Sequence, residues 1–362
     1  MKKKNTWTKV FALLTVAALG LTACGTADTG STNNDKQSND KVAAAGITDS
    51  KDDDSTTGDL ITIRVGVCAG DDRQYLKILD NHTDFLKERG INYETTEFAA
   101  GINTIDAITT GQIDIGNFAD YAGVNRIGNT LGENELRAFA ATGKSDLWSL
   151  YVNPEKIKEA SDFEKATVIN MPGVVTEYDY GKLYETYDID PDKVGIANVS
   201  SAQEALAVIA AGDGDAYWTG AQVKDQVESY GWEPFTNLTD IDALMYGYLV
   251  STETYLTEHK EDLKKFLEVS DEAAKYITDN LDEFAEWVEE DLGLSKERVI
   301  AGWQAAEHQY TFDQESYDDL IKVKDWCFAH ERFDTDYKIK DYVNTDALAE
   351  VFPDRVTWSA TE

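Results

Sequence analysis

Residues 104–115 have the sequence Thr-Ile-Asp-Ala-Ile-Thr-Thr-Gly-Gln-Ile-Asp-Ile. The apolar residues before Gly111 fit one face of a helix, whereas those after it alternate as in a strand. Gly111 permits the left-handed conformation that ends a helix, and Asp114 can cap or brace the turn into the strand. The stretch therefore predicts a helix, a glycine stop and a strand.

The same pattern returns about one hundred residues later, at residues 204–217. Gly212 and Asp215 keep the spacing of three that separates the glycine from the aspartate in the first copy. The repetition predicts two lobes built alike. We interpret the aspartate of each copy as structural rather than ligand-binding.

Strands and helices alternate around both copies, which is typical of parallel β/α units in an α/β fold. The predicted strands are 60–68, 91–98, 149–152, 167–170, 194–199 and 246–250. The predicted helices between them are 75–89, 178–187 and 221–230. Glu, Lys, Ala and Leu dominate the remaining sequence and predict a helical C-terminal region. Its helices are expected over 258–280, 281–291, 295–307 and 314–330.

The composition limits the classes of partner. The chain has 362 residues and a formal charge of −35, so it lacks the Lys and Arg excess with which proteins neutralise nucleic acids or dock on anionic membranes. Hydrophobic residues make up 42% of the chain and aromatic residues 11%, which is enough to build a core. The length suits about two domains of ordinary size.

The N-terminus resembles the export signal of a bacterial lipoprotein. Residues 1–23 combine a lysine-rich start with an apolar run that is short for a membrane span. The run ends in Leu-Thr-Ala before Cys24, as in a lipobox, and the resemblance implies lipidation of Cys24. The alternative is an ordinary export signal with an incidental cysteine. Residues 24–59 are polar and predict a disordered tether, so we expect an extracytoplasmic domain anchored by lipid to the cell membrane.

Motifs of catalysis and metal binding are absent from the sequence. It contains no G-x-S-x-G elbow, Walker loop, dinucleotide fingerprint or HExxH helix, and we expect no cofactor. Asp71 and Asp72 follow the first predicted strand, where they could hold a cation or an amine or form a solvated turn. Cys68 and Cys327 could meet in space or remain buried thiols.

The ordered set of motifs resembles the solute-binding lipoproteins of ABC importers, and more closely the nitrate/sulfonate/taurine-type binding proteins. The motifs that carry the resemblance are Glu97–Gly101, Ala107–Gly116, Asp190–Val194 and Ala205–Trp218. The resemblance implies a type II periplasmic-binding-protein fold, with two lobes, a hinge and a helical C-terminal region. It places lobe 1 in residues 60–146 plus 248–362 and lobe 2 in residues 147–247. Crossing segments near residues 146–152 and 246–250 would form the hinge.

In such a fold the ligand lies between the lobes, at the carboxyl ends of strands. The backbone around Gly173, Val174 and Thr176 could hold an anion, because it precedes a helix. Asn117 could hydrogen-bond the ligand, and aromatic side chains could wall it. The ligand-binding residues expected from the resemblance are Asp71, Phe98, Gly101, Asn117, Phe118, Gly173, Val174, Thr176, Tyr217 and Trp218.

The loops mapped to the cleft bear on the ligand. They contain Asp71, Asp72, Asp120 and Glu177, with only Lys144 basic, which argues against a bare inorganic anion. A zwitterion such as taurine, or a neutral or amine-bearing heterocycle such as a thiamine-pyrimidine precursor, suits this charge as well. We therefore expect a monomeric, non-enzymatic protein that captures a small organic solute, sulfonate- or taurine-like or related, for an ABC permease and its ATPase. The alternatives are a surface sensor or adhesin, and an enzyme related to the thiamine-pyrimidine synthases.

Overall fold

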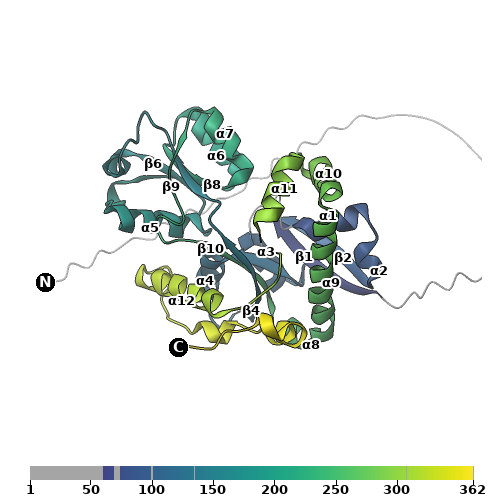
Figure 1. Ribbon diagram of the computed structural model, residues 1–362. Helices are drawn as coiled ribbons and strands as arrows, with labels where there is room; N and C mark the ends of the chain where they lie inside the picture. The colour runs from purple at the N-terminus through teal and green to yellow at the C-terminus, as the bar shows by residue number, and fades with distance from the viewer. Residues whose placement is uncertain (1–59, 69–73, 99–100, 134, 307, 362) are drawn as a thin grey trace, which may run out of the picture. The chain divides into compact units, whose positions relative to one another are not determined.

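The computed structural model describes residues 60–68, 74–98, 101–133, 135–306 and 308–361 (Figure 1). All of them belong to the compact unit Thr56–Glu362. The predicted signal, the predicted lipidation site Cys24, the predicted tether and Asp71 lie outside the described residues. Within the described part, none of the helices has the length and apolar character needed to cross a membrane.

The first sheet is assembled from two groups of strands. β1 (Ile61–Cys68) pairs in parallel with β2 (Ile91–Phe98). β10 (Met245–Thr252) pairs antiparallel with both β3 (Gly116–Ala119) and β4 (Leu136–Ser145). A parallel bridge between Val65 and Ile115 connects the groups. The spatial order is therefore β2-β1-β3-β10-β4.

The second sheet has five strands in the order β7-β6-β8-β5-β9. β6 pairs in parallel with β7 and β8, whereas β5 runs antiparallel to β8 and β9. Figure 1 shows α5 on one face of this sheet and α6 and α7 on the other. The strands are β5 (Ser149–Val152), β6 (Thr167–Asn170), β7 (Gly195–Asn198), β8 (Ala216–Thr219) and β9 (Glu233–Asn237).

The described residues form thirteen α-helices in addition to the two sheets. Those that precede β10 are α1 (Tyr75–His82), α2 (Phe85–Glu88), α3 (Gly101–Thr109), α4 (Asp120–Asn129), α5 (Thr176–Tyr187), α6 (Ala202–Ala211) and α7 (Ala221–Ser229). The C-terminal region adds α8 (Glu253–Glu258), α9 (Lys260–Asp279), α10 (Leu281–Leu292), α11 (Lys296–Ala305), α12 (Gln314–Ala329) and α13 (Asp346–Val351). The predicted α/β class and helical C-terminal region are confirmed.

The first copy of the repeated motif forms the turn predicted from the sequence. Gly111 follows α3 with a φ of +70°, in the left-handed region. Asp114 accepts hydrogen bonds from the backbone N–H of Arg64 at 2.9 Å and from its guanidinium Nη2 at 2.5 Å. The structural interpretation of Asp114 is confirmed, because its carboxylate joins the turn to β1.

The second copy forms the same brace on the second sheet. Gly212 ends α6 with a φ of +76°. Asp215 accepts a hydrogen bond from the backbone N–H of Thr167 on β6 at 2.8 Å, and Lys156 lies 2.5 Å away. The structural interpretation of Asp215 is confirmed as well.

The prediction of one continuous helix over residues 75–89 is wrong, because this segment forms two helices, α1 and α2. Thr83 separates them with an extended backbone. Its hydroxyl donates to the carbonyl of Leu79 at 2.6 Å and accepts from the N–H of Phe85 at 3.2 Å. These local bonds replace helical ones and so end α1 early.

Candidate ligand-binding site

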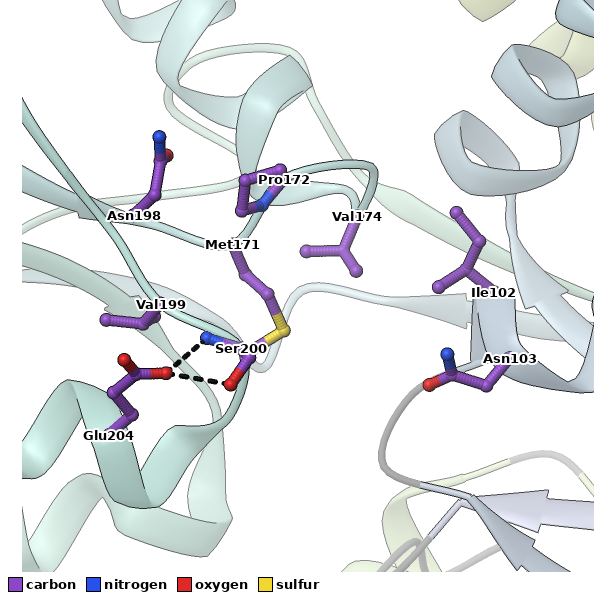
Figure 2. A pocket seen from close by; sticks show the side chains of 9 residues that line it. All are labelled: Ile102, Asn103, Met171, Pro172, Val174, Asn198, Val199, Ser200 and Glu204. Carbon is purple, nitrogen blue, oxygen red and sulfur yellow. Dashed lines mark hydrogen bonds between the residues drawn. The ribbon is translucent and has the colours of Figure 1, made fainter. Parts of the chain in front are cut away.

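A cavity of about 420 Å³ opens between the N-terminus of α3 and the carboxyl ends of β6 and β7 (Figure 2). Helix α3, beside the first sheet, supplies two lining residues, and the segments around β6, β7 and α6 of the second sheet supply the others. The described lining residues are Ile102, Asn103, Met171, Pro172, Val174, Asn198, Val199, Ser200 and Glu204. The cavity is thus assembled from segments far apart in the sequence.

A buried threonine positions the α3 wall of the cavity. The Thr104 hydroxyl donates to the carbonyl of Asn117 at 2.8 Å and accepts from the N–H of Asn117 at 3.1 Å, which fixes α3 to the start of β3. Gly101 begins α3 in close contact with the same strand, since a Cβ there would lie 3.0 Å from the Asn117 carbonyl oxygen. A larger residue would crowd this contact, so glycine suits the position where α3 meets β3.

The opposite wall is the loop that connects β6 to α5. Gly173 adopts a φ of +80°, and a Cβ there would lie 3.1 Å from the Ile102 side chain across the cavity. Below this loop, Thr176 donates to Asn170 at 3.2 Å, and Asn170 donates to Asn198 at 3.4 Å. These bonds connect the ends of β6 and β7 and hold the loop over the edge of the sheet.

Glu204 is the one charged residue among the described lining residues. Its carboxylate accepts hydrogen bonds from the Ser200 N–H at 2.7 Å and hydroxyl at 2.8 Å, and these bonds lower the pKa of Glu204 (Figure 2). The Ser201 hydroxyl in turn accepts from the Glu204 N–H at 3.2 Å, so α6 is capped. The cavity rim therefore keeps a negative charge at neutral pH.

The predicted site residues fall into two groups. Gly101, Asn117, Gly173 and Val174 lie at or beside the two walls, with Val174 itself lining the cavity. Phe98 is half-buried at the end of β2. Thr176 is buried beneath the β6–α5 loop.

The predicted aromatic wall lies elsewhere in the described structure. Phe118 is buried against Tyr248, with ring centroids 5.8 Å apart. Trp218 and Tyr217 are also buried, and they project into the separate hydrophobic clusters on the two faces of the second sheet. Alternation along β8 explains the split, because neighbouring residues of a strand face opposite sides.

The sequence analysis missed several lining residues, chiefly Ile102, Asn103, Asn198, Ser200 and Glu204. Asn198 lies near the carboxyl end of the predicted strand 194–199 and Ser200 directly follows it, so the rule that ligands bind at such ends could have identified them. Cys68 and Cys327 form no disulfide in the described structure. In the described segments, no group of three or more His, Cys, Asp or Glu is arranged to hold a metal ion.

A comparison with protein families matches residues 75–283 to the family described as NMT1/THI5 like. The match covers more than half of the chain. The protein belongs to the NMT1/THI5-like family. No curated protein matches the chain.

Solved structures share the fold of this NMT1/THI5-like protein. The alkanesulfonate-binding protein SsuA from Xanthomonas axonopodis pv. citri, bound to MOPS, has a TM-score of 0.67 at 14% identity, covering 80% of this chain and 99% of SsuA. A Candida albicans gene product with the generic periplasmic binding protein fold has a TM-score of 0.60 at 14% identity, covering 84% and 98%. DszB, a desulfurization enzyme solved with biphenyl-2-sulfinic acid, has a TM-score of 0.62 at 12% identity, covering 81% and 99%. The predicted periplasmic-binding-protein fold and the resemblance to sulfonate-type binding proteins are confirmed.

Proposed function

We propose that this protein is the solute-binding component of an ABC importer and captures a small organic solute between its two lobes. The observation that carries the proposal is the cavity lined by α3 on one side and by the ends of β6 and β7 on the other. A solute in this position contacts both sheets, so its binding favours the conformation that holds the two walls together. A permease can recognise that conformation.

The lining chemistry favours a solute that is zwitterionic, neutral or amine-bearing. Ile102, Met171 and Val174 offer apolar contact, and the amides of Asn103 and Asn198 offer donors and acceptors. The ionised Glu204 at the rim attracts an ammonium group and repels a simple anion. Taurine, which carries both an ammonium and a sulfonate, is our leading candidate.

The remaining parts of the proposal concern the anchor and the partners. Lipidation of Cys24 would hold the folded domain at the outer face of the cell membrane through the tether of residues 24–59. The division into lobe 1 (60–146 plus 248–362) and lobe 2 (147–247) remains a proposal. The partners are the permease and its ATPase, and the protein acts as a monomer.

Thermal unfolding of the purified protein against a solute panel tests the binding function. The panel contains taurine, ethanesulfonate, nitrate, amino acids and pyrimidines. A solute present at 100 times its Kd stabilises the fold by about 2.7 kcal/mol, which is readily measured. We expect taurine to shift the midpoint more than ethanesulfonate, which has no ammonium group. Absence of a shift with every solute would overturn the proposed function.

Two asparagines provide a matched test of the cavity. Asn103 and Asn129 are both exposed residues of helices beside the first sheet, but only Asn103 lines the cavity. We expect Asn103→Ala to weaken taurine binding about fivefold, in line with one lost hydrogen bond of about 1 kcal/mol, and Asn129→Ala to leave it unchanged. Equal effects would place the solute elsewhere.

The fold shared with DszB makes an enzyme the second candidate. Mass spectrometry of the panel solutes after incubation with the protein distinguishes the two functions. A binding protein returns each solute unchanged, whereas the appearance of a product would establish catalysis. Recovery of the protein with a permease and an ATPase from membranes would separate an importer component from a surface sensor.

A further inference from the structure

Three buried carboxyl groups lie at the junction between α4, α5 and α12, away from the lining of the cavity. Asp120 begins α4, Asp179 lies in the first turn of α5, and Asp319 lies in α12. Their exposed fractions are 1%, 0% and 9%. Helices α4 and α12 pack beside the first sheet, whereas α5 covers the second sheet, so the carboxyl junction links the two (Figure 1).

Asp120 and Asp319 have hydrogen-bond partners at the carboxyl junction. Asp120 accepts from the backbone N–H groups of Tyr121 at 2.6 Å and Tyr246 at 2.7 Å. Asp319 accepts from the Tyr248 hydroxyl at 3.3 Å and shares a hydrogen bond with Asp120. Burial raises the pKa of Asp120 to about 6 and that of Asp319 well above its usual range.

Asp179 differs from the other two, because both of its carboxylate oxygens are buried without a hydrogen-bond partner among the described residues. Burial, reinforced by the negative charge of Asp120, raises the pKa of Asp179 well above its usual range. A buried carboxyl in this situation takes up a proton rather than remain charged and unpaired.

Other ionisable groups face the carboxyl junction from each packed element. Tyr178 on α5, Tyr121 on α4 and Tyr248 on β10 have pKa values raised by burial and stay neutral. Lys322 on α12 lowers the pKa of Asp120 and Asp319, and it binds Asp242 at 2.8 Å in the segment leading to β10. Nearby, Glu177 accepts from Tyr121, and burial raises the pKa of Cys327 to about 12 although Arg332 opposes the shift.

The helix that carries Asp179 also positions the cavity. Val175 is the N-cap of α5, so the helix begins directly after the loop that contains Gly173 and Val174. Further along, Gly181 packs against Trp326 on α12, and the Trp326 indole donates to Glu185 at 2.8 Å. The docking of α5 on α12 therefore fixes where the β6–α5 loop stands relative to Ile102.

We propose that Asp179 is a positioning residue whose proton keeps α5 docked at the carboxyl junction, so that loss of this proton at higher pH releases the β6–α5 loop from the cavity. The inference rests on the proposed function, since the released loop lines the proposed solute site. Ionised Asp179 would place a second negative charge beside Asp120 and repel it. Because the folded protein holds this proton at pH values where the unfolded chain has lost it, stability falls as pH rises above about 4 towards the raised pKa.

Asp179→Asn tests this inference, because asparagine matches the shape of aspartate and stays neutral at every pH. Asp225→Asn on α7 is the control, since Asp225 is exposed on the opposite face of the second sheet and its side chain makes no hydrogen bond among the described residues. The full chain is unfolded with urea between pH 5 and pH 8. The folding equilibrium constant of Asp179→Asn, relative to wild type, should rise by up to about tenfold per pH unit. For Asp225→Asn the ratio should stay constant.

Hydrogen exchange of residues 171–178 provides the readout that a merely structural role would not change. Labelling times are scaled to the intrinsic exchange rate at each pH. Wild type and Asp225→Asn should lose about tenfold protection or more in this segment between pH 5 and pH 8, whereas Asp179→Asn should keep it.

Protection that falls equally in wild type and Asp179→Asn would overturn the inference. If Asp179→Asn does not fold, constant protection of residues 171–178 in wild type across the same pH range would overturn it. Neither readout uses a solute. Failure of the whole solute panel would thus remove the proposed function and leave the result for Asp179 standing.

Discussion

The first and second sheets can be compared strand by strand. The first sheet has the strand order β2-β1-β3-β10-β4, and the second has the order β7-β6-β8-β5-β9. In each sheet the fourth strand, β10 or β5, runs antiparallel to both of its neighbours. In each, an aspartate three residues after a left-handed glycine accepts a backbone N–H from the first parallel strand. The feature that recurs is this bond between a carboxylate and the backbone.

The cation that accompanies each aspartate differs between the sheets. Arg64 lies on the braced strand itself and reaches Asp114 through two guanidinium nitrogens. Lys156 reaches Asp215 from a turn outside the sheet, with a single ammonium. The carboxylate recurs in both turns, whereas the source of the positive charge varies.

The helices that follow the first strand of each unit also differ. In the first sheet, α1 packs Tyr75 against Trp303, with ring centroids 5.7 Å apart. In the second sheet, α5 instead joins the carboxyl junction and packs Gly181 against Trp326 of α12. Only the second arrangement links helices from both sheets, which is why we assign the control of the cavity to α5.

Removal of the aspartates should produce the largest loss of stability and should rank the two braces. We expect Asp114→Ala to lower the free energy of unfolding by about 3 kcal/mol, because it removes a backbone bond and a two-point ion pair. Asp215→Ala should cost about 2 kcal/mol, because its ion pair with Lys156 has a single point of contact. Urea denaturation measures both.

Asp213→Ala is the control for these two variants. Asp213 is exposed next to the second brace, and its side chain makes no hydrogen bond among the described residues. The change should stay within about 0.5 kcal/mol of wild type. If Asp114→Ala and Asp215→Ala were as mild as this control, the two braces would not support the repeated turns.

The contact between α5 and α12 should give the next largest effect. A Cβ on Gly181 would collide with the Trp326 ring and lie 2.7 Å from its Cη2, so Gly181→Ala should cost about 2 kcal/mol through overpacking. Gly302 is a matched control within α11, where a Cβ would meet nothing within 4 Å. Gly302→Ala should stabilise the protein by about 0.5 kcal/mol through helix propensity. Calorimetry that ranked the two variants the other way would disprove the tight packing of α5.

Local sequence signals explain what could be predicted of this molecule. The repeated Gly-to-Asp spacing predicted the two turns because both depend on residues close in sequence, and alternation with β-branched residues predicted β1. The break at Thr83 was missed because its hydroxyl competes with the helix for backbone partners, an effect that apolar spacing does not reveal.

Tertiary packing explains what the sequence did not reveal about the site. The cavity is lined by both Asn103 and Asn198, and the carboxyl junction contains Asp120, Asp179 and Asp319, although each set spans many residues of chain. The aromatic residues of β8, Tyr217 and Trp218, were expected at the ligand because the family resemblance maps them to the cleft. They are buried instead, since both faces of the second sheet are covered by helices.

The glycines that end α3 and α6 should give the smallest effect and the closest test of equivalence. Gly111 and Gly212 have φ values of +70° and +76°, and a Cβ on either would meet nothing within 4 Å. Alanine at each position should therefore cost only the strain of a left-handed backbone, about 1 kcal/mol, and the two costs should agree. Asparagine tolerates this conformation better, so Gly111→Asn and Gly212→Asn should each recover part of the loss in urea denaturation. A large difference between the two alanine variants would show that the repeated turns share a sequence pattern without sharing its energetics.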